Sequence, residues 1–543
     1  MGSSSSIMRP EELIEFRKLN TTIENVEVPA RAENRVVTDK KGFVFFGIAI
    51  LLLIPCLVYT LMTVDTRLMT HDTDNCGNFC GLNNSRRPRV PCSGKDFRSK
   101  PDVDGNGECT KLLFRNEFRS LGGRSYTLDF KELMGESESV WWRYVLAIFF
   151  TIVLGVLTLV LLRFAPAPFV WGILTISMLG LLAITGYHWV LYFQNDEISW
   201  PPREQVPLAS VIFWTIFCFI MMVILLVVSK RIGLVIQLYK ETTKVLAAMP
   251  SIVFFPIFIA FIQIIVFIAA IVTTFWMLFA QKLTKEGPNL YTYQLSGIAI
   301  FTIVFNVIVA SWVMRFIAGI QYMTIAGSVA QWYFSRNKDQ LNSPVWTSFK
   351  ITLKYHLGTI AFGSFLMTLF AVVKILLKII FRNACCKCFM KLCCNNAEML
   401  LKFLSGNSYI QTAIHGQSFL RSAKRATKLL LKNLANIVVI SCAGDFILGV
   451  IIALVAVLAS AISFALFKDT HDPKEATSIC FVINIVIICV IFGTFQTIID
   501  TLFICFCEDS IMNDGISRPY YMSRGLMEFI ENSKKGQPQP VTE

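Results

Sequence analysis

Ten long stretches without aspartate, glutamate, lysine or arginine constrain the fold of this chain more than any other feature. A helix crosses the roughly 30 Å hydrocarbon core of a bilayer in about 20 residues, and burying a charge there is expensive. Each stretch is about that long or longer, so the pattern predicts a bundle of membrane-crossing helices. The stretches are Gly42–Val64, Tyr144–Leu162, Phe164–Asn195, Gln205–Ser229, Val245–Gln281, Gly287–Met314, Phe316–Ser335, Tyr355–Val373, Phe446–Phe467 and Ala476–Ile499.

The composition excludes a soluble fold and several classes of function. Charged residues make up 16% of the chain, against about 25% in ordinary globular proteins. The net charge of +13 is not a sign of a nucleic-acid partner, because lysines and arginines between apolar stretches are typical of membrane proteins. The sequence contains no P-loop, no Gly-x-Ser-x-Gly and no His-x-x-x-His. We therefore expect neither an enzyme nor an ATP-driven pump, and no cofactor or metal ion.

The basic residues also orient the chain, since cytosolic loops are rich in lysine and arginine. Four of them precede the first stretch: Arg31, Arg35, Lys40 and Lys41. The segment 374–432 carries eleven basic residues and one glutamate, which predicts that it is cytosolic. The resulting organisation is a cytosolic arm (1–41), a first membrane helix (42–64), an extracellular loop (65–140), a transmembrane core (141–507) and a cytosolic tail (508–543).

Arg315 separates the sixth and seventh stretches and decides the number of crossings. If 287–335 crosses once, strict alternation places the basic segment 374–432 outside. A split at Arg315 returns that segment to the cytosol and gives about ten helices with both termini cytosolic, but it places the loop Arg336–Lys354 outside. The alternative is one long broken helix, with a tenth crossing hidden inside Cys385–Ala435. We expect the split, in an all-α polytopic membrane fold.

Two groups of cysteines suggest covalent modification. The loop after the first stretch holds an even number of cysteines and a glycosylation triplet at Asn83, which fits an oxidising outer face. Two disulfides are expected in preference to a zinc site, and three pairings are open. The cysteines concerned are Cys76, Cys80, Cys92 and Cys109. Cys385 and Cys386 follow an apolar stretch beside lysines, where palmitoylation and ordinary reduced thiols are equally good interpretations.

Three ionisable residues interrupt apolar segments and are candidates for function: Arg315, Asp445 and Asp500. Buried charges in membranes are expensive and usually face a partner or an aqueous path. The plainer interpretation is that both aspartates lie near span ends, cap a helix or pair with Arg315. Close to Arg315, the aromatic and amide side chains of Trp312, Gln321 and Tyr322 could receive an organic cation, since aromatic faces attract cations.

Several ordered blocks in the second half of the chain resemble the choline transporter-like proteins. They are Ile317-Ala318-Gly319 to Trp332-Tyr333, Tyr355-His356-Leu357-Gly358, Ser408-Tyr409-Ile410 to Ser422-Ala423-Lys424, and Glu508-Asp509-x3-Asn513-Asp514-Gly515-x2-Arg518-Pro519-Tyr520. The resemblance implies a ten-span carrier with a glycosylated outer loop. It also implies sodium-independent transport of choline, with ethanolamine as a second substrate, at plasma and organelle membranes for phospholipid synthesis.

The residues themselves leave a second class of function open. A membrane scaffold or lipid-handling protein without significant choline transport would also fit the basic segment 374–432, which suits anionic lipid headgroups. An ion channel is a weaker third interpretation, because no filter loop is evident. The expected partners are thus a small organic cation and membrane lipids, while the oligomeric state, the driving ion and the exact site stay open.

Overall fold

A computed structural model describes most of the apolar chain. The described residues are 34–69, 79, 141–193, 207–229, 232–287, 290–380, 384–431, 434–469, 473–513, 518–523 and 527. Within these ranges, nine helices are long and apolar enough to cross a membrane. They are α2 (Lys40–Thr63), α5 (Trp141–Phe164), α6 (Pro166–Phe193), α7 (Leu208–Ser229), α9 (Ser251–Met277), α10 (Gly297–Phe334), α12 (Leu357–Ile380), α15 (Leu434–Phe467) and α16 (Pro473–Met512). The expectation of an all-α polytopic membrane protein is confirmed.

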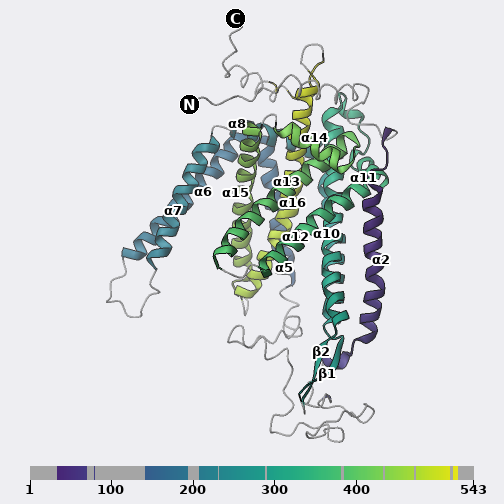
Figure 1. The fold of residues 1–543 in the computed structure, drawn as a ribbon. Coiled ribbons are helices and arrows are strands. Elements are labelled where there is room, and N and C mark those ends of the chain that lie inside the picture. Colours follow the sequence, from purple (N-terminus) through teal and green to yellow (C-terminus); the bar gives the residue numbers. More distant parts are fainter. Residues whose placement is uncertain are drawn as a thin grey trace.

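Four shorter or more polar helices complete the bundle: α8 (Ile232–Ala248), α11 (Pro344–Tyr355), α13 (Ala384–His415) and α14 (Phe419–Leu431). Helices α8, α11 and α14 gather at one end of the bundle, while the hairpin of β1 (Gln281–Gly287) and β2 (Leu290–Leu295) lies at the opposite end (Figure 1). We call these the inner end and the outer end. The pair α6 and α7 extends to one side of the bundle (Figure 1).

Two hydrophobic clusters form the interior and meet along α16. One joins α2, α10, α12, α13 and α14 to the inner part of α16, including Ile498 and Leu502. The other joins α5, α6, α8 and α15 to α16 and includes Phe492 and Ile499. Helix α16 therefore packs against both clusters, and polar residues on it are held between the two halves of the bundle.

The predicted split at Arg315 is wrong, because α10 is one continuous helix of 38 residues, Gly297–Phe334. Neither proline nor a pair of glycines lies near Arg315, and a long charged side chain does not by itself break a helix. The flanking Trp312 and Phe316 are buried against neighbouring helices, which holds this turn in place. The loop after α10, expected outside, lies instead at the inner end: Thr38, before α2, donates its backbone N–H to the carbonyl of Tyr355 at 2.9 Å.

The basic segment 374–432 is not a single loop. It comprises the end of α12, all of α13 and α14. Helix α13 packs on α10, α12 and α16, and the Tyr409 hydroxyl reaches the carbonyl of Ile360 at 3.4 Å, so α12 and α13 form an antiparallel hairpin. At 32 residues and about 1.5 Å per residue, α13 is long enough to cross a bilayer. It lies within the range where the alternative placed a hidden crossing.

The outer end is built around the two-stranded hairpin. Its strands pair antiparallel, with Leu283 opposite Tyr293, and Phe79 from the loop after α2 stacks on the Tyr293 ring at 5.9 Å. The glycosylation candidate Asn83 and the disulfide candidates lie outside the described residues: Cys76, Cys80, Cys92 and Cys109. The side chains of Cys385 and Cys386, in the first turn of α13, also lie outside the described part of the structure.

Candidate functional site

A cavity of about 450 Å³, the large cavity below, lies between α9, α10 and α16. This is within the range of small-molecule sites. Its walls are mostly apolar, and its polar groups gather on a few positions. The polar side chains are Gln263, Gln321, Tyr322, Cys489 and Thr497. Two candidates from the sequence, Gln321 and Tyr322, thus line one cavity.

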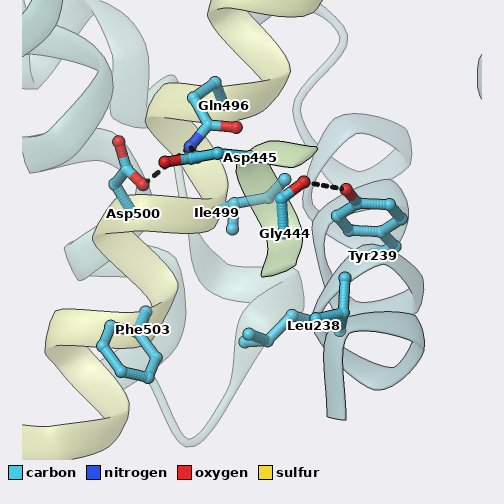
Figure 2. Close-up of a pocket in the computed structure, with 9 residues that line it drawn as sticks. Leu238, Tyr239, Gly444, Asp445, Gln496, Ile499, Asp500 and Phe503 are labelled. Atoms are coloured by element: carbon cyan, nitrogen blue, oxygen red, sulfur yellow. Dashed lines mark hydrogen bonds between the residues drawn. The ribbon is translucent and has the colours of Figure 1, made fainter. Parts of the chain in front are cut away.

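A second, small pocket lies beside the first, between α8, α15 and α16, and it contains both candidate aspartates. Gln496 links them: its amide nitrogen donates to Oδ1 of Asp445 at 2.6 Å and to Oδ1 of Asp500 at 3.0 Å (Figure 2). Tyr239 closes the opposite side, where its hydroxyl donates to the carbonyl of Gly444 at 2.8 Å (Figure 2). One neutral amide therefore holds two carboxylates from different helices.

Tyr322 connects the two cavities. It lines the large cavity, and its hydroxyl lies near enough to Asp500 in the small pocket for the two groups to interact electrostatically. On α16, Thr497 faces the large cavity while Gln496 and Asp500 face the small one. The arrangement brings a phenol ring and a carboxylate together at the polar end of an otherwise apolar cavity.

Asp445 and Asp500 lie at similar distances from the ends of their helices. Asp445 lies eleven residues after the start of α15 at Leu434, about 16 Å along the helix at 1.5 Å per residue. Asp500 lies twelve residues before the end of α16 at Met512, about 18 Å along the helix at 1.5 Å per residue. Neither carboxylate therefore lies at a helix end.

Trp312 lies apart from both cavities. Its indole N–H donates to the carbonyl of Ala361 at 3.2 Å and to Oγ of Ser364 at 3.1 Å. Its ring packs against Phe46 at 5.0 Å and Phe365 at 5.1 Å. Both faces of the indole are thus used in packing between α2, α10 and α12, and a cation in either cavity would not meet this ring.

Arg315 is half-buried in the middle of α10. Within the described residues, no ion pair joins it to Asp445 or Asp500, whose carboxylates accept from Gln496 instead. Its Nε is buried and has no hydrogen-bond partner in the described part of the chain. The pairing of Arg315 with an aspartate, one of the interpretations of the sequence, is therefore not found there.

Sequence reasoning missed several residues of the site. Gln496 lies one helical turn before Asp500, so a search for polar side chains at i−4 from the buried aspartate would have found it. Gln263 is a lone amide in an apolar stretch, and that isolation is a usable signal. Tyr239 and Gly444 carry no such signal, because their roles depend on how α8 packs against α15. Among the described residues, no group of three His, Cys, Asp or Glu side chains could hold a metal ion.

The sequence blocks quoted above converge on the inner end of the bundle. Asp509 accepts from the hydroxyl of Tyr333 at 3.1 Å and from the backbone N–H groups of Tyr521 and Met522, each at 2.9 Å. Arg336 donates to the carbonyl of Pro519 at 2.6 Å. These contacts fasten the chain after α16 to the end of α10.

A bundle of apolar helices with a cavity between them and two carboxylates in its interior defines a polytopic membrane protein with an internal polar site. The family model described as "Plasma-membrane choline transporter" matches residues 212–511, more than half of the chain. The chain belongs to this choline transporter family. The matched range contains the residues that line the large cavity and the small pocket.

Curated relatives agree with this assignment. Choline transporter-like protein 1 of Mus musculus is 30% identical over 415 residues, which is 71% of this chain and 63% of that protein. Choline transporter-like protein 2 of Dictyostelium discoideum is 29% identical over 82% of this chain and 76% of that protein. Choline transporter-like protein 4 of Bos taurus is 27% identical over 83% of this chain and 75% of that protein. The chain thus spans less than two thirds of the length of the mouse relative.

Proposed function

We propose that this protein carries choline, or a closely related small organic cation such as ethanolamine, across the membrane. The observation that carries the proposal is the cavity between α9, α10 and α16, which places Tyr322 beside Asp500 at its polar end. The names of the matched relatives support the choice of substrate. Transport down a gradient or coupled to protons, without sodium, is the mode we propose.

The chemistry of the site suits a quaternary ammonium ion. Such an ion has no N–H to donate, so it is bound by aromatic faces, apolar walls and a carboxylate at a distance. Tyr322 offers its ring, and Asp500 offers a negative charge in a site shielded from water, where its attraction for a cation is stronger than in solution. Gln321 and Thr497 can accept from the hydroxyl at the other end of choline.

We also infer a topology of ten crossings, made by the nine apolar helices and α13. Helix α13 is more polar than the others because the charged side chains Lys387, Lys391, Glu398 and Lys402 lie on it. With ten crossings the start of α2 and the end of α16 share a side, as they do at the inner end (Figure 1). We place that side in the cytosol and the protein in the plasma membrane, with organelle membranes as further sites.

Uptake of labelled choline into proteoliposomes tests the proposal. Saturable uptake over empty vesicles is expected, unchanged when sodium is replaced by potassium. Asp500→Asn is expected to raise the KM for choline about tenfold, which corresponds to a loss of about 1.4 kcal/mol. Asp469→Asn, at an exposed turn of the outer end, is the matched control and should leave the KM unchanged. Absence of saturable uptake by the folded parent protein contradicts the proposal, and lipid scrambling without uptake favours a lipid-handling protein.

A further inference from the structure

A buried polar seam leads from the candidate site to the inner end of the bundle. Gly406 on α13 lies against Tyr322 so closely that a Cβ there would be 3.0 Å from the Tyr322 hydroxyl. From this point buried polar residues follow one another along α13 towards Glu508 on α16. They are Asn407, Ser408, Gln411, Thr412 and Glu508, none more than 6% exposed. Polar side chains are costly to bury in a membrane protein, so a continuous row of them calls for a function.

Glu508 ends the seam and is held by a cation. Arg425 on α14 donates from Nε to Oε1 at 2.9 Å and from Nη2 to Oε2 at 2.8 Å. Gln411 adds a hydrogen bond to Oε1 at 2.8 Å, and Nε2 of His415 lies 3.4 Å from the same oxygen. The Glu508 side chain is 1% exposed and that of Arg425 is 10% exposed, so the guanidinium closes the carboxylate off from the inner surface.

The neighbouring Asp509 shows what a purely structural carboxylate looks like in this protein. Its oxygens accept from neutral donors: the hydroxyl of Tyr333, the amide of Asn513 and two backbone N–H groups. These donors belong to fixed parts of the chain, and a passing ion would have to displace all of them. Glu508, in contrast, is paired with the charged side chain of Arg425, whose positive charge a second cation can replace.

Several polar atoms in and beside the seam have no hydrogen-bond partner in its closed form. Among the described residues, Nδ2 of Asn407, Oε1 of Gln411 and Oγ of Ser405 are buried without a hydrogen-bond partner. A buried polar group without a partner is costly, and such groups in native proteins call for an explanation. Water or a polar ligand entering an open seam would satisfy all three, so the cost is recovered when the seam opens.

We propose that this seam is the closed inner half of the cation path and that Glu508 is a second cation-binding carboxylate, occupied by Arg425 while the seam is closed. The inference rests on the proposed function and extends it. A cation that leaves Asp500 passes Asn407 and Gln411 and meets Glu508, which exchanges the guanidinium of Arg425 for the ammonium group. The ligand class is the same small organic cation, bound here by a carboxylate and two amides.

Native cysteines report whether the seam opens. Cys507 is 7% exposed and precedes Glu508, whereas Cys480, 1% exposed, lies toward the outer end of the same helix. Purified protein in lipid nanodiscs is treated with a water-soluble maleimide, with and without choline, and labelled cysteines are identified by peptide mass spectrometry. In Arg425→Gln we expect labelling of Cys507 to be at least tenfold faster than in the parent, and choline to slow it several-fold. In Arg425→Gln/Glu508→Gln, labelling stays fast but choline no longer slows it.

The controls separate an open seam from an unfolded protein. Lys374→Gln removes an ion pair between α12 and α13, with Glu398, and should label like the parent. Cys480 should stay unlabelled in every variant. If Arg425→Gln does not fold, Arg425→Lys keeps the charge, loses the two-point contact and should show choline protection at higher choline concentration.

The outcomes distinguish this inference from the proposed function. If the parent takes up choline but Arg425→Gln does not change the labelling of Cys507, the seam is not a path that Arg425 closes. The transport proposal is unaffected by that result. Equal choline protection in the single and double variants overturns the role of Glu508. Faster labelling with protection that depends on Glu508, in a protein without choline uptake, supports the cation site and contradicts transport.

Discussion

Arg35 donates a hydrogen bond from Nη1 to Nε2 of His356, 3.0 Å away, although both side chains are basic and buried. Because a guanidinium has only donors, Nε2 is the acceptor and the ring carries its proton on Nδ1, which faces Oγ1 of Thr38 at 3.0 Å. Burial, and then the charge of Arg35, lowers the pKa of His356 to about 3. His356 is therefore a neutral link between the segment before α2 and the start of α12.

This link predicts a dependence of stability on pH. The pKa of His356 is lower in the folded than in the unfolded protein, so between about pH 6.5 and pH 3 the unfolded state binds the proton and stability falls as pH falls. From pH 6.5 to 5 the loss is about 2 kcal/mol. Thermal unfolding in detergent at pH 7 and pH 5 should therefore show a larger drop for the parent than for His356→Gln. Equal drops would show that His356 is not the group responsible.

Trp312 is expected to matter for stability and not for substrate affinity. Trp312→Ala removes a buried indole and leaves a cavity, a change that costs about 3–5 kcal/mol in protein cores. Trp312→Phe keeps most of the packing and loses only the two hydrogen bonds of the N–H group, so it should be milder. Melting temperature in detergent measures the first effect and choline KM in proteoliposomes the second. A raised KM in Trp312→Phe would return this residue to the binding site.

Cys489 offers a test of the large cavity, because it is exposed and lines that cavity. A methanethiosulfonate that carries an ethyltrimethylammonium group would attach a choline-like cation to its sulfur and should abolish most uptake. Choline should slow this inactivation, and Cys489→Ser should be insensitive to the reagent. The matched background is Cys393→Ser, which removes another exposed thiol and should stay sensitive. Inactivation that persists in Cys489→Ser would place the effect elsewhere.

Gly358 is predicted to tolerate no side chain. A Cβ at this position would lie 2.3 Å from the carbonyl oxygen of Asp39 and 2.4 Å from that of Thr38, a distance at which backbone must move. Gly358→Ala should therefore separate the start of α2 from α12 and lower the yield of monodisperse protein severalfold. Gly449→Ala, on α15 with nothing within 4 Å of the added atom, is the control and should leave the yield unchanged. Similar yields for both variants would contradict the close packing.

Hydropathy located the nine long apolar helices of the described residues but wrongly divided one of them at Arg315. Arg315 interrupts a stretch of uncharged residues, but it does not interrupt the helix. The backbone hydrogen bonds of a helix continue through a charged residue. Conversely, charged residues interrupt the apolar run of α13, although this helix packs against α10, α12 and α16. Counting charges along the chain cannot detect this packing, because the packing depends on helices that are distant in sequence.

The candidate site was predicted in part. Asp445 and Asp500 were predicted because each is an ionisable residue within an apolar stretch. In the structure they line one pocket and are linked by Gln496. Proximity in sequence pointed to Trp312, but on α10 this residue faces α12, whereas Tyr322 contacts Asp500 of α16. Which face of a helix meets which neighbour is set by tertiary packing, so a list of polar and aromatic residues could not separate these two.

The unbroken α10 has a mechanical consequence. At 38 residues and about 1.5 Å per residue, it is a rod of about 57 Å that begins directly after the outer hairpin and ends at Tyr333 and Phe334. The Tyr322 of the site lies on this rod between the two ends. A tilt that moves the outer hairpin in one direction must swing Tyr333, and with it the Asp509 anchor, in the other. The outer hairpin and the Asp509 anchor are therefore joined by one unbroken helix that also carries the Tyr322 of the site.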